Sequence, residues 1–337
     1  NIIHSRHQGQ KPCTDFWSFA QDSAPGAGDG AVRVPGPALV VPPGDSTLTI
    51  NLRNTLPEPV SIVIPGQITS MAPVRNADGR VRSFTRETAP GRSATYTWNR
   101  FKPGTYLYHS GSHAAVQVQM GLYGAVVKDA AAGAAYPNVS CARDVVLLFS
   151  EIDPEIHDAV ATPGGFGPGA AVSSTIDYEP RYFLINGEPF SNRKASHLFA
   201  GRPGERILLR FLNAGLETHT PVLQGLHATL VAEDGNPYAW PKSQYSVDLP
   251  AMKTADAVIV APEKATVPVY DRRLCLTNDM SAPGGMAAFL NILPPLVIEA
   301  EPEVVGGGST FAMDVELNEN ITRPFDFYLL LDRKSVV

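Results

Sequence analysis

Ser46-Thr47-Leu48-Thr49-Ile50-Asn51-Leu52 alternates polar and apolar side chains, and this stretch sets the expectation for the fold. Ser93-Ala94-Thr95-Tyr96-Thr97-Trp98 alternates in the same way. A period of two residues is typical of a β-strand that buries one face against a core. Pro42-Pro43-Gly44-Asp45 precedes the first stretch and Ala89-Pro90-Gly91 precedes the second, and such residues let the chain reverse direction. We therefore predict two half-buried strands that begin after tight turns.

Apolar stretches of the same kind recur in the second half of the chain. They lie at residues 206–212, 227–232 and 256–260. A helical period is nowhere sustained over about 12 residues, and only residues 153–160 have the pattern of a short helix. The predicted fold class is therefore all-β, with two consecutive sandwich or barrel domains.

The domain organisation follows from these two sets of strands. We place the first domain at residues 1–130 and the second at residues 141–300, joined by an alanine-rich linker at residues 131–140. Residues 301–337 are interpreted as the start of a truncated further segment. The last part of it, residues 332–337, has the sequence that one frame of a common sequencing adapter encodes, and we hypothesise that it is a sequencing artefact.

Composition argues against several classes of protein. The 337 residues carry 27 Lys and Arg against 33 Asp and Glu, a net charge of −6, which disfavours a nucleic-acid-binding protein. No apolar run reaches about 18 residues, so the sequence predicts no membrane-spanning helix. Cys13, Cys141 and Cys275 lack the CxxC spacing of a zinc site. The motifs of serine hydrolases, zinc proteases, phosphate loops and dinucleotide-binding folds are also missing.

Short motifs occur along the chain in an order that resembles the multicopper oxidases, a family built from consecutive cupredoxin domains. They are PGPAL at 35–39, NTLPEP at 54–59, GTYLYHS at 104–110, GLYG at 121–124, RFLNA at 210–214, GLH at 225–227 and VAEDG at 231–235. The resemblance implies two consecutive cupredoxin-like Greek-key β-sandwich domains.

The resemblance also implies copper chemistry. Members of the family oxidise a phenol, an amine or a metal ion one electron at a time at a mononuclear copper, and they reduce O2 to water at a three-copper cluster. Two His-x-His pairs in the first domain contribute to that cluster, and imidazole is a suitable copper ligand. The resemblance therefore implies copper as cofactor, a small phenolic or metal-ion substrate, and a periplasmic or secreted location.

The copper motifs are incomplete in this sequence. The first His-x-His position falls on Val63-Ile64-Pro65-Gly66, where no side chain can ligate a metal. The second position retains His109 and His113, which in an extended chain would lie about 13 Å apart unless Gly111 folds the loop back. His109 and His113 are therefore the candidate metal ligands, and the alternative is that both satisfy local hydrogen bonds.

Other groups point to no further catalytic or cofactor-binding site. The family's electron-entry site needs a His-Cys-His element, which does not occur in this sequence, and Cys275 is interpreted as a buried, inert thiol. Glu151, Asp153 and Glu155 alternate, and we interpret them as a solvated acidic face. The other histidines are interpreted as core, turn or loop residues: His4, His7, His157, His197, His219 and His227.

Two functional hypotheses remain open. In the first, the chain is the N-terminal portion of a multicopper-oxidase-like protein that oxidises phenols or metal ions with O2. A missing C-terminal cupredoxin domain would then hold the electron-entry copper, and the fragment itself would be inactive. In the second, the chain is a copper-free cupredoxin scaffold that binds a partner in the cell envelope.

Overall fold

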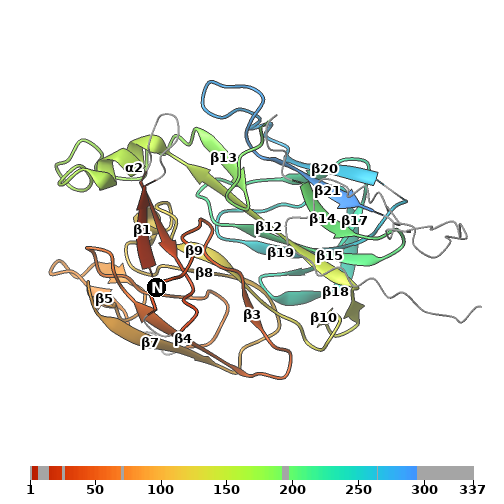
Figure 1. Cartoon of the computed structure of the whole chain (residues 1–337), viewed down its shortest axis with the longest axis horizontal. Coiled ribbons are helices and arrows are strands. Elements are labelled where there is room, and N and C mark those ends of the chain that lie inside the picture. The colour runs from red at the N-terminus through yellow and green to blue at the C-terminus, as the bar shows by residue number, and fades with distance from the viewer. Residues whose placement is uncertain are drawn as a thin grey trace, which may run out of the picture. The chain divides into compact units, whose positions relative to one another are not determined.

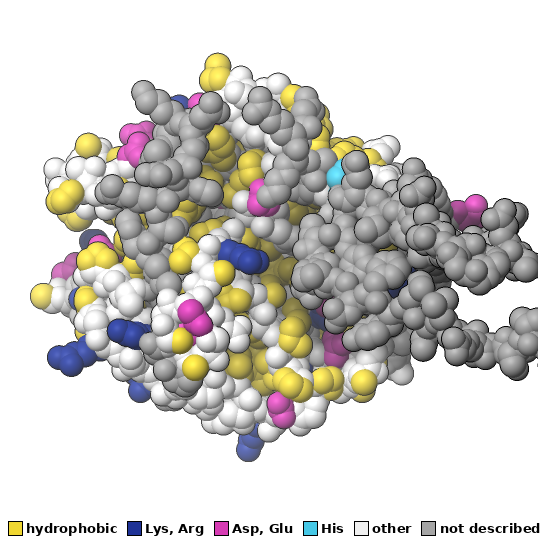
Figure 2. Space-filling view, in the orientation of Figure 1, with side chains coloured by type: hydrophobic (Ala, Val, Ile, Leu, Met, Phe, Trp, Pro, Cys, Tyr) yellow, Lys and Arg dark blue, Asp and Glu magenta, His cyan; other side chains and the backbone are white. Residues whose placement is uncertain are grey.

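The computed structural model describes residues 2–6, 15–24, 27–69, 72–191, 197–263 and 265–293. The chain divides into two units, residues 1–294 and 295–337, and every element below belongs to the first. Within the described residues no helix has the length and apolar character needed to cross a membrane. Figure 2 shows charged side chains of both signs on the described surface of one face.

The first half of the unit is made of small sheets (Figure 1). Its elements are β1 (Ile2–Arg6), β2 (Asp15–Phe19), β3 (Leu39–Val41), β4 (Thr47–Arg53), β5 (Val74–Arg75), β6 (Val81–Ser83), β7 (Ser93–Asn99), β8 (Gly104–His109), α1 (Ala114–Gln117) and β9 (Tyr123–Lys128). One sheet has the order β3-β9-β8, with β3 parallel and β8 antiparallel to β9. The remaining strands form antiparallel pairs, β1 with β2, β4 with β7 and β5 with β6.

Burial alternates along β4 and β7 as the sequence pattern predicts. Leu52 and Trp98 are buried, whereas the side chains of Thr49 and Asn51 are exposed. The buried side chains join aromatic residues of β8, among them Tyr108, in one hydrophobic cluster. The two predicted strands are confirmed, because alternation places each apolar side chain on the face that meets this cluster.

The second half of the unit contains two larger sheets. Its elements are β10 (Ala134–Tyr136), β11 (Val139–Ser140), β12 (Arg143–Ile152), α2 (Pro154–Ala161), β13 (Tyr182–Ile185), β14 (His197–Gly201), β15 (Arg206–Asn213), β16 (Pro221–Leu223), β17 (Ala228–Glu233), β18 (Asn236–Gln244), β19 (Thr254–Val260), β20 (Ala265–Asp271) and β21 (Ala287–Ile292). The sheet orders are β13-β12-β15-β19-β17-β18 and β14-β21-β20-β16. In Figure 1, β12, β15 and β19 run side by side.

The core of this half lies between the two sheets. Phe149 of β12 and Phe211 of β15 stack at a centroid distance of 6.4 Å, and Leu290 of β21 belongs to the same buried cluster. β15 is buried from its second residue to its last, as expected for a strand with neighbours on both edges. The predicted strands and the short helix are confirmed as β15, β17, β19 and α2.

Residues 131–140, which we predict to be a linker, form a folded connection. It contains the antiparallel pair β10 and β11, and Tyr136 is buried with its hydroxyl donating to Asp256. Ala135 is also buried and belongs to a cluster with Val258 of β19. This connection therefore contributes buried side chains to the packing against β19.

A buried guanidinium joins the sheets of the two halves. Arg210 on β15 is 1% exposed, and it donates to Asp144 at 2.5 Å and to Asp129 at 2.6 Å. It also donates to the hydroxyl of Thr105 on β8 at 3.0 Å. Thr105 donates in turn to Asp256 on β19 at 2.7 Å. Because a buried guanidinium is costly unless its donors are paired, this network fixes β8 against β15 and β19.

We predict that Arg210→Met lowers the free energy of unfolding by about 3 kcal/mol, because it removes three hydrogen bonds and the positive charge that compensates the buried carboxylate of Asp256. Arg206→Met, on the same strand but exposed, is the matched control and should change it by less than about 0.5 kcal/mol. Urea denaturation measures both values, and equal losses in the two variants would contradict the assigned role.

Candidate functional site

His109, the first candidate ligand, ends β8 in a buried position. It is 4% exposed, and its backbone exchanges two hydrogen bonds with Val63, at 2.9 and 3.0 Å. Its Nδ1 lies 2.8 Å from the carbonyl oxygen of Ser110. A carbonyl oxygen only accepts, so Nδ1 carries the proton and Nε2 carries the lone pair. Nε2 has no hydrogen-bond partner among the described residues.

The charge state of His109 follows from this burial. Loss of solvation lowers its pKa to about 4, although the hydrogen bond to Ser110 acts in the opposite direction. The imidazole is therefore neutral at pH 7. A neutral imidazole with a free Nε2 is able to accept a hydrogen bond or to ligate a metal.

A polar network fixes the loop that follows His109. Ser110 donates to Gln117 at 2.6 Å, and Gln117 donates to the carbonyl oxygen of Pro59 at 3.0 Å. The loop folds at Gly111, where a Cβ atom would lie 2.8 Å from a methyl group of Val63. Glycine is therefore needed for the close approach of this loop to the neighbouring chain.

His113, the second candidate ligand, is in a different environment. Its side chain is exposed, its φ is 40°, and it precedes α1 without a side-chain capping bond. Its backbone N–H donates to the carbonyl oxygen of Arg82 at 2.9 Å. The loop thus leaves one histidine buried and the other on the surface. Joint metal binding by His109 and His113 stays a prediction.

Apolar side chains surround His109. A cavity of about 590 Å³ adjoins it, lined by Val63, Ile64, Pro65, Gly66, Gln67, Thr69, Phe84, His109, Ala114, Ala115, Val118, Leu216 and Met252. They include Val63, Ile64, Pro65 and Gly66, where the resemblance predicts the family's first His-x-His pair to fall. In the part of the chain that the structure describes, no group of three or more His, Cys, Asp or Glu is placed to hold a metal ion. The described residues at this position therefore do not by themselves complete a copper cluster.

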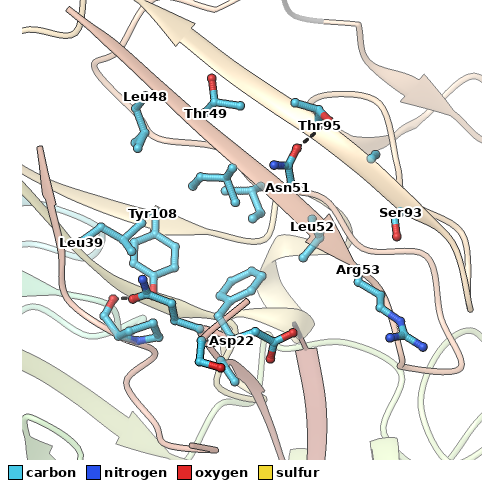
Figure 3. Close-up of a pocket in the computed structure, with 18 of the residues that line it drawn as sticks. Asp22, Leu39, Leu48, Thr49, Asn51, Leu52, Arg53, Ser93, Thr95 and Tyr108 are labelled. Atoms are coloured by element: carbon cyan, nitrogen blue, oxygen red, sulfur yellow. Dashed lines mark hydrogen bonds between the residues drawn. The ribbon is translucent and has the colours of Figure 1, made fainter. Parts of the chain in front are cut away.

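A second cavity, of about 820 Å³, lies between β3 and β4. Figure 3 shows Leu39 beside Tyr108 in this cavity and Arg53 further along β4. Asn51 accepts a hydrogen bond from Thr95 at 2.8 Å on its β4–β7 wall. Its described lining residues include neither histidine nor cysteine.

A buried ionic cluster forms around His219. Its Nδ1 lies 2.8 Å from Asp271, and its Nε2 is hydrogen-bonded to Glu151. All three side chains are fully buried. Burial alone lowers the pKa of His219, but the hydrogen bonds to Asp271 and Glu151 outweigh it and raise the pKa to about 9. His219 is therefore an imidazolium held between two carboxylates at neutral pH.

The interpretation of Glu151 and Asp153 as a solvated face is wrong, because both are 3% exposed. Glu151 also accepts from the hydroxyl of Tyr178 at 3.0 Å and from the backbone of Leu216 at 3.1 Å. A Cβ atom on Gly215 would overlap its carboxylate. β12 ends at Ile152, so the alternation that we extended to residue 155 stops there.

Asp153 has a local structural role that the sequence could have revealed. It is the N-cap of α2 and accepts from the backbone of Glu155 at 2.9 Å, and Pro154 follows it. An aspartate followed by proline is a typical helix start. The role of His219 has no such local signal, since Glu151 and Asp271 lie far from it in the sequence.

The remaining histidines and cysteines have ordinary surroundings. His157 is buried in α2 against Phe16, His197 stacks on Phe289 at 5.2 Å, and His227 is exposed. Cys141 and Cys275 are free and half-buried, and burial raises the pKa of Cys275 to about 11. His4 lies in β1, while His7 and Cys13 lie outside the described residues.

The raised pKa of His219 leads us to predict that the folded chain loses stability at alkaline pH. Its pKa is about 9 in the folded chain against an ordinary 6.5, so its contribution is complete below pH 6.5 and is lost as the pH rises through 9. Between pH 6.5 and 10 the stability advantage of the wild type over His219→Gln should shrink by about 3 kcal/mol. Urea denaturation across this range measures it, and a constant difference would refute the assignment.

Val63→His should create a metal-binding pair with His109, because directly opposite residues of an antiparallel pair project from the same face. We expect Cu2+ affinity to rise on the order of tenfold, measured by isothermal titration calorimetry. The double variant Val63→His with His109→Phe is the control and should return to the wild-type affinity. Equal gains in the single and double variants would show that the two side chains do not act together.

Comparison with known proteins agrees with this architecture. Family models described as multicopper oxidase match residues 31–132 and 160–286. The chain is 28% identical to copper resistance protein A of Escherichia coli, over 82% of this chain and 50% of that protein. It is also 28% identical to laccase-3 of Arabidopsis thaliana, over 69% of this chain and 40% of that protein. The chain thus spans about half the length of the curated relatives it matches.

Solved structures show the same fold. A blue copper oxidase from Nitrosomonas europaea superposes with a TM-score of 0.64 and 20% identity, covering 86% of this chain and 82% of that chain. A copper nitrite reductase from the same organism gives a TM-score of 0.63 and 19% identity, covering 88% and 92%. With its two sets of sheets and both family matches, this chain belongs to the multicopper oxidase family and consists of two consecutive cupredoxin-like β-sandwiches.

Proposed function

We propose that this chain supplies two cupredoxin domains to a copper-dependent oxidase that transfers electrons from a phenol or a metal ion to O2. The observation that carries the proposal is the buried, neutral imidazole of His109, whose Nε2 is free. Family membership and the similarity to a copper resistance protein and a laccase support the same reading. A periplasmic or secreted location is part of the proposal.

In this proposal the chain contributes one or two copper ligands and not a complete copper centre. Copper, when bound, would supply one-electron oxidation of substrate and reduction of O2. His109 would hold a copper through Nε2, and His113 is the second candidate ligand. The other ligands would come from a further cupredoxin domain. We also propose that the first domain ends at residue 130 and that the second begins at residue 141.

A copper-free scaffold that binds a partner in the cell envelope is the second candidate function. One observation favours it: Val63, Ile64 and Pro65 place carbon, not nitrogen, around His109. A copper-free cupredoxin fold is physically reasonable, because the hydrophobic clusters of both sandwiches contain no histidine, cysteine, aspartate or glutamate and hold together by apolar packing.

Oxygen uptake tests whether the chain alone is an oxidase. We predict that the purified 337-residue chain, loaded with Cu2+ and desalted, consumes no more O2 with a phenol or Fe2+ than free copper at equal concentration. The reason is that the described residues place no group of three or more His, Cys, Asp or Glu where it could hold a metal ion. Four-electron reduction of O2 to water by this chain would overturn the prediction.

Copper retention after desalting separates the two candidate functions. Up to one copper per chain, lost in His109→Phe and kept in His227→Phe, would favour the oxidase reading. Equal copper content in all three proteins, or none, would favour the scaffold. Circular dichroism of each variant establishes that the sandwiches are intact.

A further inference from the structure

The cavity between β3 and β4 lies along two strand edges that have no neighbouring strand. Among the described strands, β4 pairs with β7 alone and β3 pairs with β9 alone. Residues 38–40 and residues 48–53 line the cavity, whose volume is about 820 Å³. A space of this size suits one ligand and not a folded domain.

The backbone of β4 offers hydrogen-bonding groups at its unpaired edge. The N–H of Asn54 donates to the carbonyl oxygen of Arg92 at 2.9 Å, which continues the β4–β7 pairing and fixes its alternation. In an antiparallel pair every second residue bonds to the partner strand, and the backbone groups of the residues between them point away from it. The residues of β4 that point away from β7 are Thr47, Thr49, Asn51 and Arg53. Figure 3 shows the last three in line along the strand.

The edge of β4 is long and regular. The strand has seven residues, contains neither proline nor lysine, and pairs with β7 without a register shift. Natural sheets usually protect an edge by a bulge, a proline, a lysine or a short strand. The edge of β4 therefore has the features of a strand that accepts a further strand.

The apolar side chains beside this edge are incompletely covered. Leu39, Leu48 and Ile50 line the cavity and pack against the hydrophobic cluster of the first sandwich, but each is only partly buried. Val40 on the edge of β3 is exposed. Alternate side chains of an added strand would cover this surface while its backbone bonds to β4.

Charge at the cavity favours an acidic group at one end. The charged residues of its lining are Asp22 and Arg53. The carboxylate of Asp22 accepts from the backbone of Gly28 at 3.2 Å and of Gly30 at 3.3 Å, within its own loop. Arg53 is exposed at the end of β4, where a carboxylate on a neighbouring strand would lie opposite it.

We infer that this cavity binds an extended peptide segment of a partner protein, which adds to β4 as an antiparallel strand. The segment has alternating apolar side chains that face the cavity and an acidic residue opposite Arg53. A second copy of this chain fits less well, because its β4 would bring β7 with it into a space for one strand. The site goes beyond the proposed oxidase function, since it requires neither copper nor electron transfer.

Amide exchange measured by NMR on the metal-free full chain tests the added strand. The probe is the peptide acetyl-Glu-Val-Thr-Val-Thr-Val-Thr-amide, in which the glutamate lies opposite Arg53 and the valines face the cavity. A saturating concentration should slow exchange of the Thr49 and Asn51 amides by about tenfold, because they gain acceptors. The Leu48 and Ile50 amides, which point to β7, are the internal control and should change less. The same composition with its three valines consecutive should give no protection.

A charge exchange at Arg53 tests the register. We expect Arg53→Glu to weaken binding of the fluorescein-labelled peptide about fivefold in anisotropy titrations, and to favour a peptide that begins with lysine in place of glutamate. Arg75→Glu makes the same change at an exposed position of β5 outside the cavity lining and should leave the affinity unchanged.

Three results would overturn the proposal: equal binding of the alternating and the rearranged peptide, unchanged exchange at Thr49 and Asn51, or equal peptide affinity of the wild type and Arg53→Glu. Protection of these amides that grows with protein concentration in the absence of peptide would also overturn it, and would show that a second copy occupies the edge. Failure of the oxidase proposal is read from O2 uptake and leaves these results unaffected.

Discussion

The buried guanidinium of Arg210 is the interaction on which the arrangement of the two sandwiches depends. A charge removed from water must find partners nearby, and Arg210 finds Asp129, Asp144 and Thr105 on different segments. Hydrophobic packing is not directional, so it cannot by itself fix how one sheet lies on another. The fixed fork of guanidinium donors supplies that direction.

A second ionic centre connects the same two halves further along the sheets. Tyr178 donates to Glu151 and to Gln119, which lies just before β9. Glu151 in turn holds His219 opposite Asp271. The charge of His219 is thus coupled to contacts that reach the first sandwich, close to the loop that follows His109. Both ionic centres include a residue of β12, Asp144 in one and Glu151 in the other, and the buried side chains between them, Val145, Leu147, Leu148 and Phe149, are apolar.

The region around His109 combines a family position with an unusual environment. The antiparallel pairing with Val63 places an isopropyl group where a second imidazole would meet a metal. Val63, Ile64 and Pro65 also line the largely apolar cavity that adjoins His109. Within the described residues, His109 is therefore a buried acceptor surrounded by carbon rather than by further metal ligands.

The sequence by itself determined the all-β class, the positions of β4, β7, β15, β17 and β19, and the family. Alternation, turn residues and ordered motifs are local, so they survive without knowledge of distant contacts. Only the tertiary structure decided that Glu151 is buried, that Tyr136 closes a folded connection, and that Nε2 of His109 is left free. The burial of Glu151 and Tyr136 depends on partners that are distant in the sequence. Glu151 and His219 are separated by 68 residues, and Tyr136 and Asp256 by 120. No pattern within a single strand encodes such a distance, because burial of a charge is settled by what the rest of the chain places around it.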